Sequence, residues 1–409
     1  MDAFLTIIQS VFKVFQDNIL TKPEFFVGIL VFIGYLLLKK PLHDAIAGFL
    51  KATVGYMILN VAAGGLVTTF RPILAGLNER FSLNAAVIDP YYGLAAVNAG
   101  LKDLGLAISF TTLALLVGFF WNILLVALSK LTKIRTLFVT GHIMVQQATT
   151  VTWLVFFAIP ELRNMGGVAL IGLLVGTYWA VFSNLTVECT QELTDNAGFA
   201  VGHQQMLGVW LTHKISPKLG KKENSLENLK LPKALQIFND NVVASSTMMV
   251  FFFGAIMLIL GEPFLRELDK ANFPATLAFP TYIINRALMF AVYVCILQLG
   301  VRMFVAELTE SFRGISDKLL PGALPAVDCA ATYGFSHPNA ITIGFLFGMI
   351  GQFVAILGLL VFHSPIMIIT GFVPVFFDNA TFAVFANKRG GVRAAMIVTF
   401  FSGILQVLG

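Results

Sequence analysis

The sequence has 409 residues, of which 57% are hydrophobic and only 12% are charged, and its formal net charge is +5. A soluble globular domain carries about 25% charged residues, so this chain would present water with a surface that is apolar over a very large area. The composition therefore excludes a soluble globular domain and indicates a protein whose solvent is lipid. No nucleic-acid partner is expected, because the cations lie between apolar stretches rather than on one basic face.

Long apolar segments recur along the chain, and a helix needs about 20 mainly apolar residues to cross a bilayer. Backbone polar groups in lipid must be satisfied within the segment, so these segments are predicted to be helices. A shorter apolar run at residues 25–38 is predicted to be a retained span or an interfacial segment. The sequence thus predicts an all-α polytopic membrane protein with about 10–11 transmembrane helices. The longer candidates are residues 52–70, 104–129, 136–160, 166–187, 241–261, 283–305, 338–362, 366–386 and 394–409.

Two further apolar stretches are poor candidates for simple spans because they contain proline and a carboxylate. Residues 84–101 include Asp89 next to Pro90, and residues 319–335 include Asp328 among prolines. Such residues at membrane depth favour re-entrant hairpins that are buried in protein and do not face lipid.

The one long polar region, residues 189–240, is predicted to be an amphipathic linker on the cytoplasmic membrane face. With the N-terminus placed outside, its lysines and most other basic residues between the spans fall on one side of the membrane. The positive-inside rule makes that side cytoplasmic. The lysines of this region are Lys214, Lys218, Lys221, Lys222, Lys230 and Lys233.

The two halves of the chain resemble each other. The segments that begin at Phe70 and at Phe312 both open with Phe-Arg and lead into a predicted hairpin with Asp and Tyr. Downstream, TGHIMVQQAT from Thr140 matches TGFVPVFFDNAT from Thr370 in order and separation. In the predicted topology the first copy starts outside and the second inside, so the repeat is inverted, as is typical of alternating-access transporters with substrate near the midplane. The copies are approximately residues 24–188 and 241–390.

Polar side chains within a membrane bundle cost free energy, so each is a candidate site residue. His142 and Gln146 are four residues apart and share a helix face. They make either interhelical hydrogen bonds or, as we favour, contacts with a sugar-like ligand that needs several converging amide groups. Asp328 either caps a half-helix or accepts hydrogen bonds from ligand hydroxyls. A further polar run belongs to this site or to a cytoplasmic loop, and it consists of His203, Gln204 and Gln205.

No metal site is predicted, because neither His142 nor His203 has a carboxylate or cysteine nearby in sequence at ligand spacing. The three cysteines show no C-x-x-C spacing. Phosphate loops, nucleophile elbows and H-E-x-x-H motifs are also absent from the sequence. We therefore expect no cofactor and no catalytic residue in this chain.

Several separated segments carry a family resemblance. They are TGHIMVQQA from Thr140, NAGFAVGHQQ from Asn196, LGKKENSLENLKLPKALQIFNDN from Leu219, GVRMFVAELTESFRGISDKLLPGALPAVDCAA from Gly300 and TGFVPVFFDNATFAVFANKRGG from Thr370. In this order they resemble the L-ascorbate-specific enzyme IIC of the bacterial phosphotransferase system, and the resemblance runs along almost the whole chain. It implies a homodimer in the bacterial inner membrane. Each protomer would have a dimerising scaffold domain and a mobile core domain that carries the substrate in an elevator-type motion.

The resemblance also implies soluble partners. Phosphate would pass from phosphoenolpyruvate to a IIA and then a IIB protein, and phospho-IIB would convert L-ascorbate to ascorbate 6-phosphate inside the cell. This chain would be a transport component without a phosphorylated residue of its own. The chain ends at Gly409 within an apolar run, where relatives are expected to continue. Carried over by motif, the substrate-binding residues would be Tyr91, His142, Gln146, Gln204 and Asp328, with His203 and Gln205 as further candidates.

Two alternatives remain open at the level of the sequence. A phosphotransferase permease for another polyol such as galactitol would use the same amides and carboxylate. An ion-coupled secondary transporter would share the inverted repeat but would not need phospho-IIB.

Overall fold

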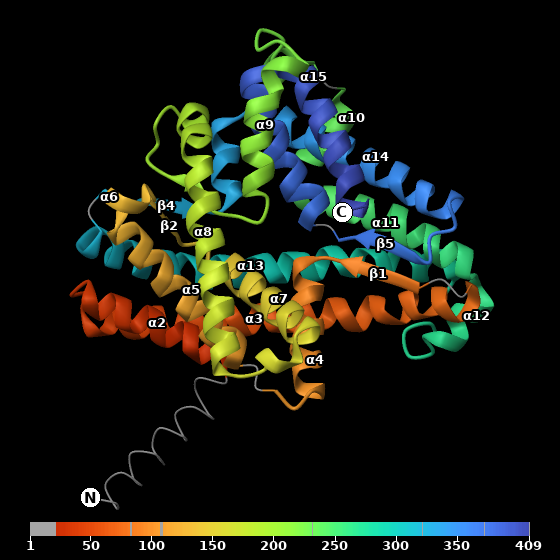
Figure 1. Ribbon diagram of the computed structural model, residues 1–409. Coiled ribbons are helices and arrows are strands. Elements are labelled where there is room, and N and C mark those ends of the chain that lie inside the picture. Colours follow the sequence, from red (N-terminus) through yellow and green to blue (C-terminus); the bar gives the residue numbers. More distant parts are fainter. Residues whose placement is uncertain are drawn as a thin grey trace, which may run out of the picture.

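The computed structural model describes residues 22–81, 84–106, 109–230, 232–320, 322–371 and 373–408. Two long helices, α3 (Leu42–Phe81) and α13 (Phe279–Leu319), form a layer with α2 (Pro23–Leu37), as Figure 1 shows. Lys51 of α3 pairs with Glu307 of α13 at 3.1 Å, whereas Gly65 further along α3 lies against Tyr293. The two long helices therefore run antiparallel.

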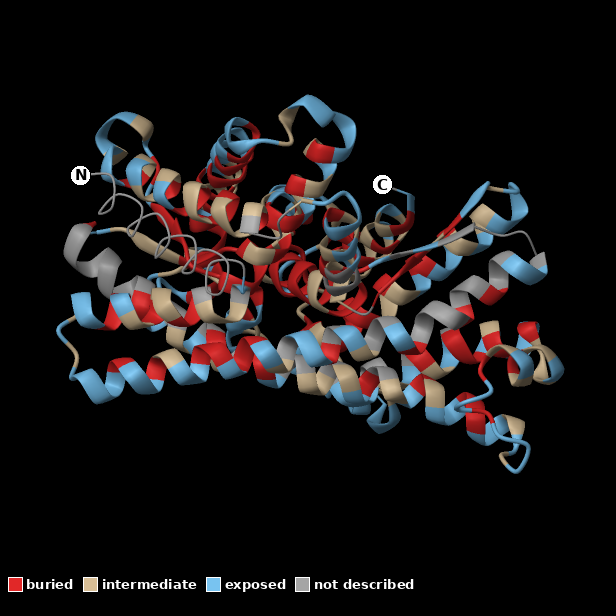
Figure 2. Cartoon of the chain, turned by 90° about the horizontal axis from the view of Figure 1, so that it is seen from below, coloured by how far each residue is buried: buried red, intermediate tan, exposed pale blue. Residues whose placement is uncertain are grey.

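In Figure 1, α9, α14 and α15 stand above this layer, and α8 runs from above the layer down past its level. Helices α5 and α8 approach closely because a Cβ added at Gly176 would lie 2.3 Å from the carbonyl oxygen of Gly118, so glycine permits the contact. Buried residues gather in the interior behind the long helices (Figure 2). The helices are α5 (Ser109–Ala127), α7 (Gly141–Ala158), α8 (Met165–Thr194), α9 (Met206–Leu219), α11 (Asn241–Leu260), α12 (Glu262–Leu268), α14 (Pro338–Val361) and α15 (Asn379–Leu408).

Short parallel strands connect the two halves of the chain. Strand β1 (Asn84–Ile88) of the first half pairs with β5 (Ile366–Thr370) of the second. Conversely, β4 (Leu324–Val327) of the second half pairs with β2 (Thr136–Phe138) of the first and, along its other edge, with β3 (Ala200–Val201). The described residues are mostly helical, as predicted, but the sequence did not predict these strands. Irregular backbone within a membrane protein must be paired with protein, and strand pairing satisfies that requirement.

The two segments predicted to be re-entrant hairpins are built alike: each consists of a short strand, an aspartate and a helix. In the first, β1 leads through Asp89 into α4 (Pro90–Asp103), and in the second, β4 leads through Asp328 into the 3-10 helix η5 (Cys329–Phe335). The Asp328 carboxylate caps η5 by accepting a hydrogen bond of 2.9 Å from the Ala330 N–H. The structural alternative predicted for Asp328, a half-helix cap, is therefore present.

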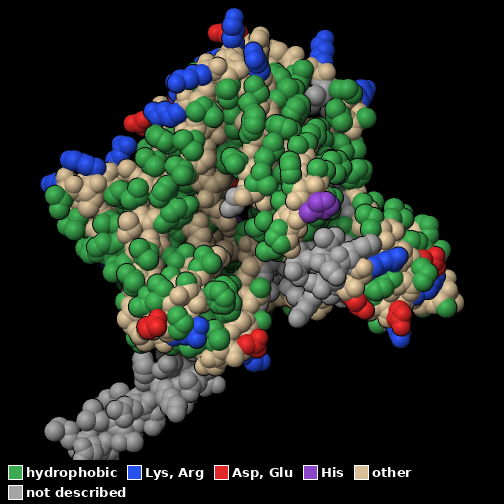
Figure 3. Space-filling model, turned by 45° about the vertical axis from the view of Figure 1, so that its right-hand side comes forward, with side chains coloured by type: hydrophobic (Ala, Val, Ile, Leu, Met, Phe, Trp, Pro, Cys, Tyr) green, Lys and Arg blue, Asp and Glu red, His purple; other side chains and the backbone are tan. Residues whose placement is uncertain are grey.

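Fewer described helices are capable of spanning a membrane than the sequence predicts. Five are long and apolar enough, or six if α11 and α12, which are bent by 97°, count as one broken span. The predicted spans 136–160 and 366–386 each begin with a strand, and residues 394–408 continue α15 beyond a break at Gly391. Figure 3 shows one face covered largely by hydrophobic side chains, with Lys and Arg along its upper edge. Such a surface suits lipid.

The predicted linker, residues 189–240, contains ordered elements. Helix α8 extends to Thr194, β3 follows, and α9 then packs against α15, where Gly208 lies against Phe382. The remaining short elements of the described chain are α6 (Ser129–Thr132), η2 (Pro160–Leu162), η3 (Leu226–Asn228), α10 (Lys233–Gln236), η4 (Ile237–Asn239) and the π-helix η6 (Pro374–Asp378).

Candidate functional site

The carboxyl ends of three parallel strands bring the predicted polar residues together. Strand β2 leads into α7 and His142, β3 is followed by His203, and β4 is followed by Asp328. Parallel strands end at the same edge of a sheet, so their following residues lie close to one another. Segments that are far apart in the sequence thus meet at one site.

A carboxylate and two imidazoles form the centre of this site. His142 Nε2 lies 3.2 Å from Asp328 Oδ2, and the rings of His142 and His203 are 6.0 Å apart between centroids. Both imidazoles are buried, whereas the Asp328 side chain keeps 33% of its surface exposed. His203 Nδ1 is hydrogen-bonded to Gln205 Oε1. The centre therefore has two oriented rings and one carboxylate that is still accessible.

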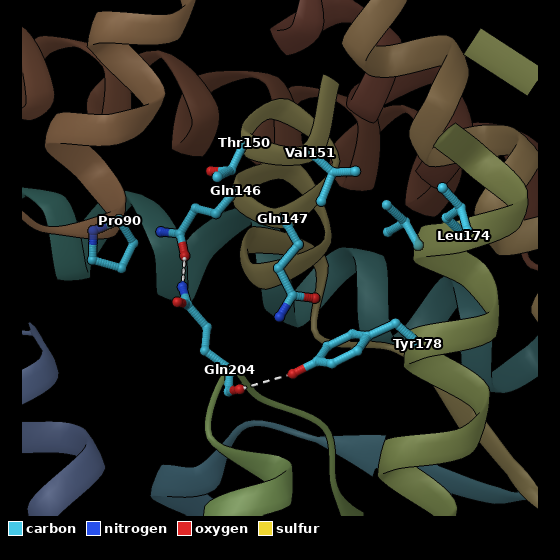
Figure 4. A pocket seen from close by; sticks show the side chains of 9 residues that line it. Pro90, Gln146, Gln147, Thr150, Val151, Leu174, Tyr178 and Gln204 are labelled. Carbon is cyan, nitrogen blue, oxygen red and sulfur yellow. Dashed lines mark hydrogen bonds between the residues drawn. The ribbon is translucent and has the colours of Figure 1, made fainter. Parts of the chain in front are cut away.

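Two glutamines border the cavity beside this centre. Gln204 Nε2 donates a hydrogen bond of 2.7 Å to Gln146 Oε1, and the Tyr178 hydroxyl donates one of 3.0 Å to the Gln204 carbonyl oxygen (Figure 4). The cavity has a volume of about 320 Å³, and its walls are mostly apolar, with these amides among its polar groups. Its lining residues are Pro90, Gln146, Gln147, Thr150, Val151, Leu174, Val175, Tyr178 and Gln204.

Supporting residues hold the glutamines in place. Gln147 accepts a hydrogen bond of 2.6 Å from the Trp179 indole, whose ring stacks on Phe138 of β2. Gln205 donates through Nε2 to the Thr381 hydroxyl at 3.2 Å, which ties the polar run after β3 to α15. Side chains that are positioned by such partners are pre-organised for a ligand.

The structure brings together most of the residue set predicted from the sequence. The side chain of Tyr91 lies outside what the structure describes, although its neighbour Pro90 lines the cavity. Sequence reasoning missed Tyr178 and Thr381, since a tyrosine or threonine within an apolar helix carries no signal of its own. The predicted residues that meet here are His142, Gln146, His203, Gln204, Gln205 and Asp328.

The reasoning that led us to expect no metal needs a correction. It relied on the lack of a carboxylate near either histidine in the sequence, but the sheet places Asp328 beside both rings. The donor atoms of His142, His203 and Asp328 all lie within 4.8 Å of one another. Sequence spacing alone is therefore no ground for excluding a metal.

Fold and site together define a multi-pass membrane protein with a mostly apolar cavity that carries several polar groups, beside a polar centre formed by segments from both halves. The family described as "PTS system sugar-specific permease component" matches residues 18–409, so the chain belongs to this family of phosphotransferase permeases. The chain is also 35% identical over 447 aligned residues to the "Ascorbate-specific PTS system EIIC component" of Mycoplasma pneumoniae. The alignment covers 100% of this chain and 66% of that relative. The family resemblance seen in the sequence is confirmed.

Proposed function

We propose that this chain is the membrane-spanning subunit of a phosphotransferase system that takes up L-ascorbate. The observation that carries the proposal is the convergence of His142, Gln146, Gln204 and Asp328 beside a cavity of about 320 Å³. Small hydroxyl-rich ligands need several oriented donors and acceptors within a mostly apolar cavity. The name of the Mycoplasma pneumoniae relative supports ascorbate among such ligands.

The two ends of ascorbate would use different groups. Ascorbate is an anion at neutral pH, so the Asp328 carboxylate is better suited to its hydroxyl tail than to its enolate. His142, Gln146 and Gln204 offer N–H groups for the enolate. Pairing a carboxylate with hydroxyl donors, and N–H donors with the anion, avoids unfavourable contact between like charges.

Movement of the substrate would follow from an inverted repeat. Each half of the chain runs from a long helix through a strand, a short helix, a longer helix and a second strand into a final helical region. The reciprocal strand pairing and the antiparallel α3 and α13 support inverted copies at approximately residues 24–188 and 241–390. In this proposal α2, α3 and α13 form the dimerising scaffold, and the helices above them form the core that moves as an elevator.

The chemical step would take place on a partner. Phospho-IIB, recharged by IIA, would transfer its phosphoryl group to the 6-hydroxyl of ascorbate at the inner face of the bacterial inner membrane. Exposed lysines at the end of α9 and in the turn after it offer positive charge for that docking. These lysines are Lys214, Lys218, Lys221 and Lys222.

The test is binding of L-ascorbate to the detergent-purified chain. Wild type should bind ascorbate and not galactitol, and Gln146→Ala and Asp328→Asn should each weaken binding by at least about tenfold, because each removes a partner of a ligand hydroxyl or anion. Binding of galactitol and not of ascorbate would show that the substrate is a polyol. Uptake that follows an ion gradient and does not need phospho-IIB would show an ion-coupled secondary transporter instead of a phosphotransferase permease.

A further inference from the structure

The centre of the site has the composition of a transition-metal site, and one of its donor pairs has the spacing of one. Two imidazoles and one carboxylate, with a fourth position left open, are a ligand set typical of accessible zinc sites. Two ligands at about 2.0–2.1 Å from one tetrahedral zinc ion are separated by about 3.3 Å. His142 Nε2 and Asp328 Oδ2 are 3.2 Å apart. This pair therefore already has the separation of two ligands on one ion.

The third ligand is oriented by its neighbours. His203 Nδ1 is hydrogen-bonded to the Gln205 side-chain oxygen Oε1, which can only accept, so Nδ1 acts as the donor and the lone pair is left on Nε2. Gln205 is held in turn by Thr381 at 3.2 Å. A ring nitrogen that donates to a fixed oxygen and leaves the other nitrogen free to bind a metal is the outer-shell arrangement found around metal-binding histidines.

Access and geometry set this cluster apart from other histidine–carboxylate contacts in the described residues. His213 lies 3.5 Å from Glu192 and His43 lies 3.5 Å from Asp44, and each of these is a pair. At the site, by contrast, donor atoms from three different segments lie within 4.8 Å of one another. The half-exposed Asp328 carboxylate leaves one side of the cluster open to an entering ion.

We propose that His142, His203 and Asp328 bind one Zn²⁺ in the absence of sugar, and that zinc and the sugar exclude each other. The nitrogen ligands favour zinc over Mg²⁺ and Ca²⁺, which prefer oxygen. Zinc is also the suitable probe because it has no redox chemistry, whereas copper(II) would oxidise ascorbate. Zinc binding stands independently of the substrate, and only the competition rests on the proposed function.

The first measurement is zinc affinity of the full chain without sugar, by competition with a chromophoric chelator after removal of any histidine tag. We expect one Zn²⁺ per chain, bound at least about tenfold more weakly by Asp328→Asn and by His203→Gln. His213→Gln, which removes a histidine that also lies beside a carboxylate, should keep the wild-type affinity. Unchanged melting temperatures would show that the variants are folded. Equal zinc binding by wild type and Asp328→Asn, or no stoichiometric binding by wild type, would overturn the proposal.

The second measurement separates the metal from the sugar. The apparent Kd for ascorbate should rise in proportion to free Zn²⁺, as competition requires. Gln146→Ala, which removes an amide of the cavity but no metal ligand, should lose ascorbate affinity and keep zinc affinity. Zinc binding without ascorbate binding would refute the proposed substrate and leave the metal site standing. Ascorbate binding that zinc does not alter would refute the mutual exclusion.

Discussion

Two segments that occupy corresponding places in the two halves of the chain differ in what they contribute. Both have Thr-Gly where a strand ends: Thr140 lies two residues after β2, and Thr370 is the last residue of β5. The first continues as the regular helix α7. The second passes through the π-helix η6 before α15, and it carries Asp378 and Asn379, which have no counterpart before the shared Ala-Thr. A π-turn is the usual way in which a helix accommodates an additional residue, and such turns are frequent at functional sites.

The side chains at matching positions have opposite chemistry. Gln146 of the first segment is bonded to Gln204 and lines the cavity, whereas Phe376 of the second is buried with its ring 5.9 Å from that of Phe345. The first segment therefore places an amide at the cavity, where we propose that it contacts the ligand, and the second supplies apolar packing. Similar placement in the fold does not imply similar function, because function lies in the side chains.

The largest loss of ascorbate affinity should follow when Gln146 is replaced by the phenylalanine of the matching position. Gln146→Phe removes the acceptor of the half-buried Gln204 amide and places a ring in the cavity. Ascorbate affinity should fall by at least about 100-fold, since one donor loses its partner and the ligand volume is filled. Equilibrium binding to the purified chain measures this loss. A variant that binds ascorbate normally would show that the cavity is not the sugar site.

The reciprocal exchange serves as the control. Phe376→Gln places an amide among aromatic rings and should lower stability by about 3 kcal/mol, seen as a lower melting temperature. Any folded fraction should retain ascorbate affinity within about twofold. The two substitutions then separate a binding residue from a packing residue at matching positions.

The sequence singled out the polar residues that the structure brings together, but it did not predict the strands that bring them together. Charge and amide groups in apolar segments are conspicuous, so His142, Gln146 and Asp328 were identified from composition alone. Strands β2 and β5 were missed because each is an apolar run that continues into a helix. The spacing of residues in a continuously apolar run does not distinguish a buried strand from a buried helix. The meeting of Asp328 with both histidines was missed for the same reason, since it depends on strand pairing across the chain.

A smaller loss of ascorbate affinity should follow from substitution of Thr381, which acts on the site through Gln205. Thr381→Val removes the hydroxyl that accepts from Gln205 Nε2 and thus loosens the partner of His203. Ascorbate affinity should fall about fivefold, which corresponds to roughly 1 kcal/mol for one hydrogen bond. The matched control is Thr399→Val on the same helix, where the buried hydroxyl bonds only to backbone oxygens and the affinity should stay unchanged. Equal effects of both variants would reduce the role of Thr381 to general helix packing.

The smallest effect is expected from substitution of Asp378, the additional acid of the second segment. Asp378 also contrasts with an aspartate that has hydrogen-bond and ion-pair partners. Asp378 lines a mostly apolar cavity of about 580 Å³ between α9 and α15, together with Leu211 and Phe401. Its carboxylate forms no hydrogen bond or ion pair within the described part of the chain. His203 and Asp89 act on this carboxylate only through their charges. Removal of a carboxylate that has neither a hydrogen bond nor an ion pair relieves a desolvation cost, so Asp378→Leu should raise stability by about 1 kcal/mol and leave ascorbate affinity within about twofold.

Asp269 is the control for this substitution, because it is a buried aspartate that is fully partnered, whereas Asp378 is half-buried. Its carboxylate accepts from Tyr282 at 2.9 Å and Asn272 at 2.8 Å, and it pairs with Arg286 at 3.3 Å. Asp269→Leu leaves the buried Arg286 charge uncompensated and should lower stability by about 3–5 kcal/mol. Melting temperatures of the two variants should therefore move in opposite directions. A loss of ascorbate affinity beyond about tenfold in Asp378→Leu would instead place Asp378 in the binding site, and the π-turn would then serve to deliver a ligand contact that the first segment lacks.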